Sequence, residues 1–173
     1  NISINPMTKS PPFLLDSNFF IEAYRVSYPF DVVPTFWIKV KELAEQGKII
    51  SVDKVKKELL QNKDELSDWI IDNLPDDFFK DTTSVIPNYA TLTGWVYSKS
   101  DQYFPTAISV FLDADEADAW LVAFAMTYGN QIVTHEVSRP NSKSRVMLPD
   151  AAIPFNITCI KTIDLFRTLG VKI

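Results

Sequence analysis

The chain of 173 residues is 46% apolar and 23% charged, a composition that predicts one folded domain and excludes a disordered chain. Its net charge of −5, from 17 basic and 22 acidic residues, argues against a generally basic nucleic-acid binder. The single cysteine, single histidine and four scattered glycines exclude an internal disulfide, any scheme that needs two histidines and a glycine-rich phosphate loop.

The first half of the chain alternates short apolar runs with helical patterns. Residues 1–12 hold three prolines without periodicity and are expected to form a flexible leader, so that one domain occupies residues 13–173. A buried strand is predicted over 13–15, and it ends at Asp16. Further elements are then predicted as helices over 18–26 and 34–46, a strand over 49–52, and helices over 53–60 and 64–73.

The second half contains the clearest helix. Residues 74–83 are predicted to form a loop, and 84–112 two helices broken near Ser100 and Pro105. The i, i+4, i+7, i+11 spacing of four apolar residues predicts an amphipathic helix over 115–128 that Gly129 ends. The remaining elements are a strand over 131–134, a polar loop over 137–145, a strand over 157–160 and a closing helix over 161–169. Strands that alternate with helices in this way predict an α/β fold with a mostly parallel sheet.

Four acids fall where such a fold places its ligands. Open α/β sheets bind ligands beyond the carboxyl ends of their strands. Asp16 ends the first strand, and Glu136 lies two residues beyond Thr134 at the end of a later strand. Asp118 lies in the first turn of the long helix, where its same-face neighbours are apolar, and Glu58 lies on the helix after the second strand. These four acids are the candidate catalytic residues.

Each acid also has a local explanation. Asp16 could cap the helix that follows it, and Asp118 could simply favour the dipole of its own helix. Glu58 could lie on a solvated helix face, and Glu136 could be an exposed loop acid. The acids therefore gain their significance from their combined placement rather than one by one.

The segments that carry these acids resemble, in order along the chain, the four motifs of PIN-domain nucleases. The matching runs are Phe13-Leu14-Leu15-Asp16-Ser17-Asn18, Val55-Lys56-Lys57-Glu58-Leu59-Leu60, Ala117-Asp118-Ala119-Trp120-Leu121-Val122-Ala123-Phe124-Ala125 and Gln131-Ile132-Val133-Thr134-His135-Glu136. The similarity covers about residues 13–170, and it is greatest to small prokaryotic members such as the VapC-type toxins. It implies a three-layer α/β/α fold with a short, mostly parallel central sheet.

The resemblance also implies a metal-dependent endoribonuclease. Crowded carboxylates repel one another, and a hard dication such as Mg²⁺ or Mn²⁺ offsets that repulsion. By resemblance, Asp16 and Asp118 are metal ligands, Glu58 is a ligand or orients metal-bound water, and Glu136 acts through water. The polar residues expected to hold these acids in place are Ser17, Asn18 and Thr134.

Some residues compete for these roles. Asp115 shares a helix face with Asp118, and Asp53 competes with Glu58. The fourth acid is commonly Asp in the family, and Glu136 is one methylene longer. His135 is expected to be an exposed loop histidine and Cys159 an inert part of the core.

An acidic nuclease still has to attract RNA. Arg139, Lys143 and Arg145 follow Glu136 closely and are candidate phosphate contacts, with a solvated basic loop as the alternative. The resemblance further implies an RNA substrate and, for a toxin, a cognate antitoxin. No run approaches the roughly 18 consecutive apolar residues of a membrane span, so no membrane association is expected. A homodimer is also conceivable, and the lone cysteine suggests a reducing compartment such as the cytoplasm.

Two other functional classes fit parts of the pattern. A haloacid-dehalogenase-like phosphatase also starts with an apolar strand and Asp, but it needs a second acid where this chain has Asn18. A catalytically degenerate nuclease scaffold that binds RNA or a protein would tolerate the change to Glu136 and a weak second motif.

Overall fold

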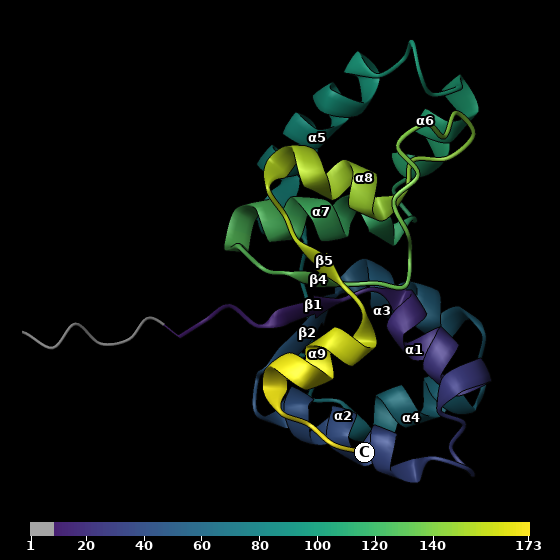
Figure 1. Ribbon diagram of the computed structural model, residues 1–173, viewed down its shortest axis with the longest axis vertical. Helices are drawn as coiled ribbons and strands as arrows, with labels where there is room; N and C mark the ends of the chain where they lie inside the picture. The colour runs from purple at the N-terminus through teal and green to yellow at the C-terminus, as the bar shows by residue number, and fades with distance from the viewer. Residues whose placement is uncertain (1–8) are drawn as a thin grey trace, which may run out of the picture.

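The computed structural model describes residues 9–173 and shows a five-stranded sheet between layers of helices (Figure 1). Most of the predicted leader, residues 1–8, lies outside the described residues, and residues 9–12 belong to no helix or strand. The strands are β1 (Phe13–Leu15), β2 (Ile49–Val52), β3 (Phe79–Lys80), β4 (Ile132–Val133) and β5 (Cys159–Ile160). Their order is β3-β2-β1-β4-β5, and all four described pairings are parallel.

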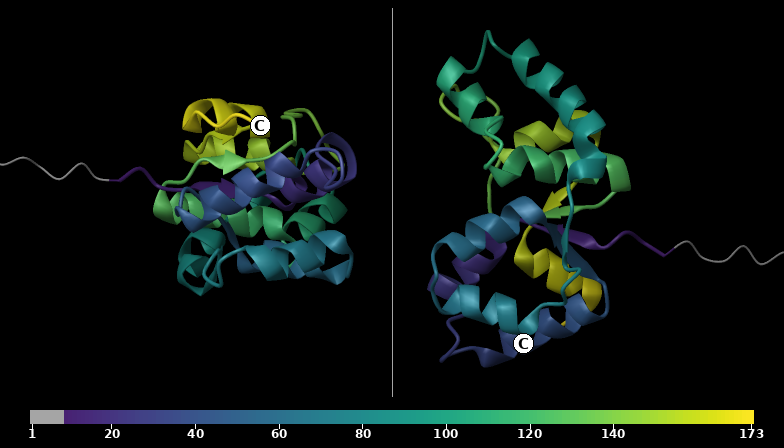
Figure 2. Two further views of the ribbon diagram at one scale, coloured as in Figure 1. Left: turned by 90° about the horizontal axis from the view of Figure 1, so that it is seen from below. Right: turned by 180° about the vertical axis from the view of Figure 1, so that it is seen from behind.

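Nine α-helices surround this sheet in the described part of the chain. They are α1 (Ser17–Glu22), α2 (Pro34–Glu45), α3 (Asp53–Gln61), α4 (Glu65–Asn73), α5 (Ile86–Ser98), α6 (Pro105–Phe111), α7 (Ala117–Tyr128), α8 (Leu148–Ala152) and α9 (Thr162–Leu169). Viewed from below, helices lie on both sides of the strands (Figure 2). The predicted three-layer α/β/α fold with a short parallel sheet is therefore confirmed.

The central strands and α7 form the middle of the core. Every residue of β2 is buried, as are Leu14 and Leu15 of β1, because both faces of a parallel sheet are covered by helices. Helix α7 packs against β2, β4, α5 and α8. It ends as predicted at Gly129, whose φ of +78° is the left-handed conformation that glycine adopts without a steric penalty.

An aromatic cluster joins α2 to α9, two helices that lie below the sheet in Figure 1. Phe36 of α2 is fully buried, stacks on Tyr28 with ring centroids 4.3 Å apart and meets Phe166 of α9 at 5.6 Å. Phe19 of α1 lies 5.8 Å from the same ring. The Phe36 side chain of α2 therefore packs against both α1 and α9.

One local prediction is wrong, one helix changes type along its length, and one short helix is missing from the predictions. The predicted loop 74–83 contains β3, which is only two residues long and has no periodicity that a sequence pattern could show. The predicted helix 18–26 is α-helical only to Glu22 and continues as a π-helical turn, Ala23–Ser27. Helix α8 was not predicted, because five residues starting Leu-Pro are too few to show a helical period.

No helix in residues 9–173 has the length and apolar character needed to cross a bilayer.

Candidate functional site

The four candidate acids come from separate elements that meet at the carboxyl edge of the sheet. Asp16 directly follows β1, and Glu136 lies three residues after β4. Because β1 and β4 are parallel neighbours, their carboxyl ends lie at the same edge. Helix α7 leads back into β4 in the opposite direction, so its first turn brings Asp118 to this edge. Helix α3, which contacts α1 and α7, brings Glu58.

Asp16 is the buried centre of a hydrogen-bond network. Only 1% of the surface of Asp16 is exposed to solvent. The hydroxyl of Thr134 donates to Asp16 Oδ2 at 2.9 Å, and the hydroxyl of Ser17 lies 3.3 Å from Oδ1. The same Ser17 hydroxyl lies 3.1 Å from Glu58 Oε1, and so bridges the first and second acids. The Asp16 side chain does not cap α1, which removes the local explanation for it.

The acids share one electrostatic environment. Burial raises the pKa of Asp16, the hydrogen bond from the Thr134 hydroxyl lowers it, and the negative charge of Glu136 raises it. The net result is a pKa above the usual value. Burial, followed by the charges of Asp16 and Glu136, raises the pKa of Asp118 well above its usual value. Burial and the charge of Asp16 also raise the pKa of Glu58 against the opposing effect of Ser17. When ionised, these groups repel one another, so the edge favours a positive partner.

Glu136 is not an exposed loop acid. Its side chain is 6% exposed and both of its carboxylate oxygens are engaged. The backbone N–H of Leu148, the first residue of α8, donates to Oε2 at 2.7 Å, and Arg145 Nη2 donates to Oε1. The backbone N–H of Glu136 itself donates to Thr134 Oγ1 at 3.1 Å. Glu136 therefore fixes the start of α8 as well as facing the other acids.

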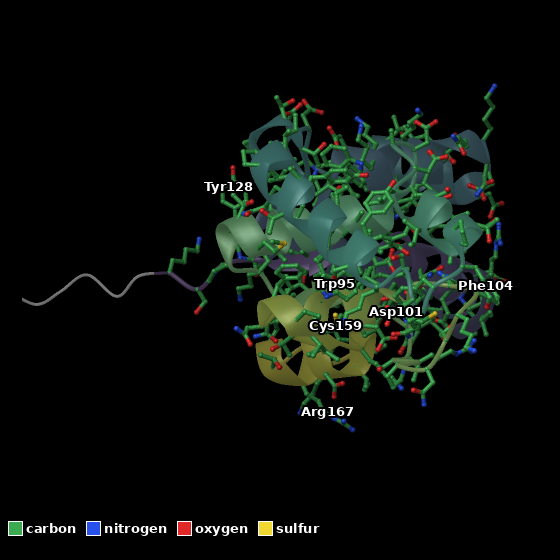
Figure 3. The ribbon with its side chains drawn as sticks, turned by 90° about the horizontal axis from the view of Figure 1, so that it is seen from above. Trp95, Asp101, Phe104, Tyr128, Cys159 and Arg167 are labelled. Atoms are coloured by element: carbon green, nitrogen blue, oxygen red, sulfur yellow. The ribbon has the colours of Figure 1, made fainter. Side chains whose placement is uncertain are left out.

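The basic loop after Glu136 forms a strap, residues 137–147, along the edge. Its backbone is held by Phe104, whose N–H donates to the carbonyl of Lys143 at 2.9 Å. Figure 3 shows Phe104 at one end of the molecule and Tyr128 at the other. Arg139 and Lys143 are exposed, whereas Arg145 pairs with Glu136 and lies 3.9 Å from Asp118.

A small groove of about 170 Å³ opens between the strap and α6, next to Asp118. Its lining consists of Ala107, Val110, Phe111, Glu116, Asp118, Ser144, Arg145 and Val146. The groove combines apolar walls with charged groups at the end nearest the acids. A ligand held in it would therefore lie directly beside the candidate site.

Some predicted residues lie apart from this cluster. Asp115 is at the surface, paired with Lys57, so the structure does not bring it to Asp118. Asp53 accepts hydrogen bonds from the N–H and the hydroxyl of Thr82, away from the other acids. Glu58 is therefore the acid of α3 that is linked to Asp16, through the hydroxyl of Ser17. Asn18 is half-buried and makes no side-chain hydrogen bond within the described residues.

His135 and Cys159 lie near the edge without joining the acids. His135 Nε2 lies 3.0 Å from the hydroxyl of Thr162 and 3.6 Å from Glu22, and so faces α9 and α1. Burial, reinforced by the charges of Asp16 and Glu136, raises the pKa of the Cys159 thiol to about 12. The thiolate is therefore strongly disfavoured at neutral pH, as expected for an inert core cysteine.

Two participants in the site were missed by sequence reasoning. The backbone N–H of Leu148 belongs to α8, which was not predicted. Glu116 lines the groove, and its charge acts on Glu58. Its position two residues before Asp118 was the signal available in the sequence.

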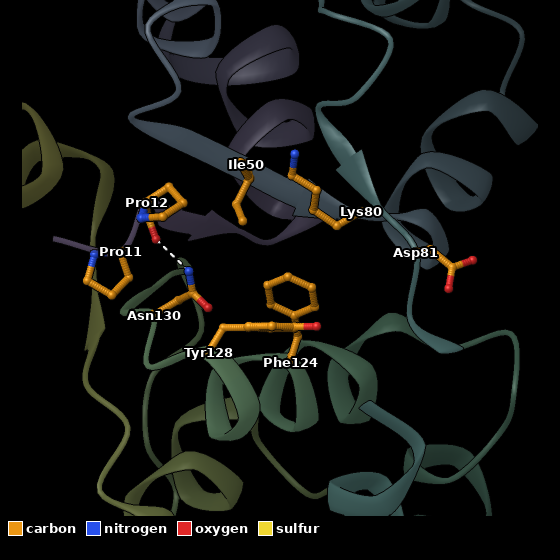
Figure 4. A pocket seen from close by; sticks show the side chains of 8 residues that line it. All are labelled: Pro11, Pro12, Ile50, Lys80, Asp81, Phe124, Tyr128 and Asn130. Atoms are coloured by element: carbon orange, nitrogen blue, oxygen red, sulfur yellow. Dashed lines mark hydrogen bonds between the residues drawn. The ribbon is translucent and has the colours of Figure 1, made fainter. Parts of the chain in front are cut away.

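A larger apolar pocket lies between the C-terminal part of α7 and strands β2 and β3, and none of the four acids lines it. It has a volume of about 540 Å³, and Figure 4 shows Phe124 and Tyr128 of α7 facing Ile50 across it. At its wall, the amide of Asn130 donates to the carbonyl of Pro12 at 2.8 Å. Ten residues of α7, about 15 Å of helix, separate Tyr128 from Asp118, so this pocket is distinct from the acidic site.

The chemistry of the acidic cluster fits a hard dication. Carboxylate oxygens are the ligands that Mg²⁺ and Mn²⁺ prefer. Within residues 9–173, however, no three Asp, Glu, His or Cys side chains already lie close enough together to hold a metal ion. A dication would therefore complete its site on binding rather than find it preformed.

Repulsion among the ionised acids should lower the thermal stability of the metal-free protein at neutral pH. The raised pKa of Asp118 stabilises the fold at low pH, below the unfolded value of about 4, and this stabilisation is lost as pH rises through the folded-state pKa. Asp118→Asn cannot suffer this loss. At pH 7.5 in EDTA we expect it to unfold a few degrees above the wild type, given roughly 2–4 °C per kcal/mol at this size.

The difference in unfolding temperature between Asp118→Asn and wild type should shrink at pH 4. Asp164→Asn is a matched control, because Asp164 lies on α9 in an exposed ion pair with Arg167. Equal or lower thermal stability of Asp118→Asn at pH 7.5 would contradict the electrostatic cluster.

Comparison with known proteins identifies one match. Residues 13–173 match the model of a family described as "Domain of unknown function (DUF4411)". No curated protein and no solved structure matches the chain significantly.

Proposed function

The chain belongs to the DUF4411 family, and we propose that it is a divalent-metal-dependent endoribonuclease that hydrolyses RNA phosphodiester bonds. The observation that carries the proposal is the convergence of Asp16, Glu58, Asp118 and Glu136 in one electrostatic cluster at the sheet edge. The ordered motifs that resemble those of PIN-domain nucleases support it independently.

Three of the acids would hold the metal ion. Asp16 and Asp118 are the proposed ligands, and Glu58 is the third ligand or holds a water bound to the ion. Mg²⁺ or Mn²⁺ would supply a water of lowered pKa and stabilise the negative charge that develops on the phosphate. This arrangement accounts for acids that are mutually repulsive in the metal-free chain.

The remaining residues prepare the acids and the substrate. The hydroxyls of Ser17 and Thr134 each donate toward one oxygen of Asp16, so they orient that carboxylate before any ion arrives. Glu136 adds negative charge to the cluster while it holds the strap. Arg139 and Lys143 are exposed on the strap and are the proposed contacts to RNA phosphates.

A second candidate is a catalytically degenerate scaffold that binds RNA or a protein. It is favoured by the engagement of both Glu136 oxygens and by the absence, in the part of the chain that is described, of a preformed metal cage. A haloacid-dehalogenase-like phosphatase is less well supported. Its nucleophile would be Asp16, but that family needs a second acid two residues later, where this chain has Asn18.

Cleavage of a fluorescently labelled single-stranded RNA tests the proposal. We expect wild type and the surface control Asp164→Asn to cleave it in Mn²⁺ or Mg²⁺. Asp118→Asn, and wild type in EDTA, should cleave at least roughly a hundredfold more slowly, because loss of a metal ligand removes several kcal/mol of charge stabilisation. Equal rates in all four reactions would rule out the proposed function, and RNA binding without cleavage by wild type would favour the degenerate scaffold.

The proposal extends to location and partners. From the lone cysteine we propose a cytoplasmic location, and we propose that the RNA substrate binds at the acidic edge. An antitoxin, if the chain is a toxin, is expected to cover this same edge, and a homodimer would have to leave it open.

A further inference from the structure

We propose that Arg145 is a built-in cation that takes the place of a second metal ion, so that the acidic edge binds one divalent ion only. The inference rests on the proposed function, because it concerns the same carboxylates. It adds the number of ions and gives Arg145 a role other than the predicted phosphate contact. In this role Arg145 is a positioning residue that acts through Glu136.

Glu136 is the acid that a second ion would need. A site for two ions needs carboxylates beyond the set that holds the first ion. Glu136 is the only one of the four acids not assigned to the proposed ion, but each of its oxygens already has a donor. One donor is the backbone N–H of Leu148 at 2.7 Å, which is fixed at the start of α8. Asp16 also accepts a hydrogen bond on each oxygen, but its donors are neutral hydroxyls, whereas one oxygen of Glu136 is paired with the positive charge of Arg145. A second ion at Glu136 would therefore have to displace that guanidinium or lie against it.

The guanidinium of Arg145 lies close to two of the acids. Arg145 Nη2 donates to Glu136 and lies 3.9 Å from Asp118 Oδ2, so it lies between the fourth acid and a proposed metal ligand. A guanidinium is effectively always charged, and this permanent charge would disfavour a dication in the same space. The backbone contact between Phe104 and Lys143 holds the strap that carries Arg145.

The net charge of the acids and Arg145 favours one bound dication over two. Four ionised carboxylates carry four negative charges, and Arg145 offsets one of them. One dication leaves a net charge of about minus one, which still favours its binding. A second dication would leave these five groups with a net positive charge, or bring them to neutrality together with the nearby Glu116, and it would lie against the guanidinium. The arginine side chain is 56% exposed, so its remaining N–H groups can still meet a phosphate from the solvent side.

Titration of metal-free protein with Mn²⁺ tests the inference, with calorimetry for affinity and electron paramagnetic resonance for the free ion. We expect wild type to bind one Mn²⁺. Arg145→Gln should bind two, because the positive charge that takes the place of the second ion has been removed. The matched control Arg167→Gln removes an arginine that pairs with Asp164 on α9, away from the acids, and should behave as wild type. In Figure 3 Arg167 lies at the margin of the molecule.

The outcomes separate the two proposals. A single Mn²⁺ bound by both wild type and Arg145→Gln, at whatever affinity, would overturn the inference and leave the proposed function intact, as would two ions bound by wild type. Binding to neither protein would overturn both. Arg145→Lys keeps the charge and should keep a single ion, so a second ion there would also contradict the inference if Arg145→Gln fails to fold. Glu136→Gln should retain the single ion, because Glu136 is not its ligand.

Discussion

Replacing Asp16 by asparagine is expected to lower RNA cleavage by roughly a thousandfold, which corresponds to about 4 kcal/mol of transition-state stabilisation. Asp16 is the most buried of the four acids and is linked to Glu58 through the Ser17 hydroxyl. Asparagine has nearly the same shape but lacks the charge that a dication requires. The rate of cleavage under saturating Mn²⁺ is the measurement.

The fold should survive this substitution. The hydroxyls of Ser17 and Thr134 can each donate or accept, so they can pair with an amide as well as with a carboxylate. Burial raises the pKa of Asp16, and removing its charge therefore relieves a cost of the native state at neutral pH. Asp16→Asn protein that is folded by circular dichroism and retains a tenth or more of wild-type activity would exclude Asp16 as a metal ligand.

Replacing Phe36 by alanine is expected to destabilise the protein by about 3–5 kcal/mol, the range for removing a fully buried aromatic side chain. The ring of Phe36 contacts residues of α1 and α9 as well as Tyr28, and alanine would leave a cavity among all three. At roughly 2–4 °C per kcal/mol, the midpoint of thermal unfolding should fall by about 6–20 °C. Urea unfolding of wild type and variant measures the free-energy difference.

Ile38→Ala provides the matched control for this change. Ile38 lies on the same helix but is 56% exposed, so its truncation should cost no more than about 0.5 kcal/mol. A loss of less than about 1 kcal/mol for Phe36→Ala would mean that α2 and α9 do not pack through this ring.

The sequence pattern predicted the parts of the fold that have a strong local signal. Helix α7 was predicted from its regular apolar spacing and ended at Gly129 as expected. Strand β2, apolar and bounded by Gly47 and Asp53, was predicted with its observed limits. Strands β4 and β5 are two residues long but lie in apolar runs, whereas β3 lies in a charged segment without such a run. Helix α8 has five residues, too few to show a helical period.

The candidate site was predictable in its members but not in their contacts. The strand ends placed Asp16 and Glu136 near one another, because the carboxyl ends of neighbouring parallel strands share an edge. The alternative of Asp115 could be rejected only from the fold, since its pairing with Lys57 joins residues 58 positions apart. The pairing of Arg145 with Glu136 was equally hidden, because the conformation of the strap depends on α6 and α8.

The most direct test of the central claim is a crystal structure of the wild-type protein soaked with Mn²⁺, with the ion located by its anomalous scattering. The account predicts a single strong peak bonded to carboxylate oxygens of Asp16 and Asp118, with Arg145 still paired to Glu136. A fully soaked crystal with no ion at these carboxylates, or with an ion bound only elsewhere, would contradict it.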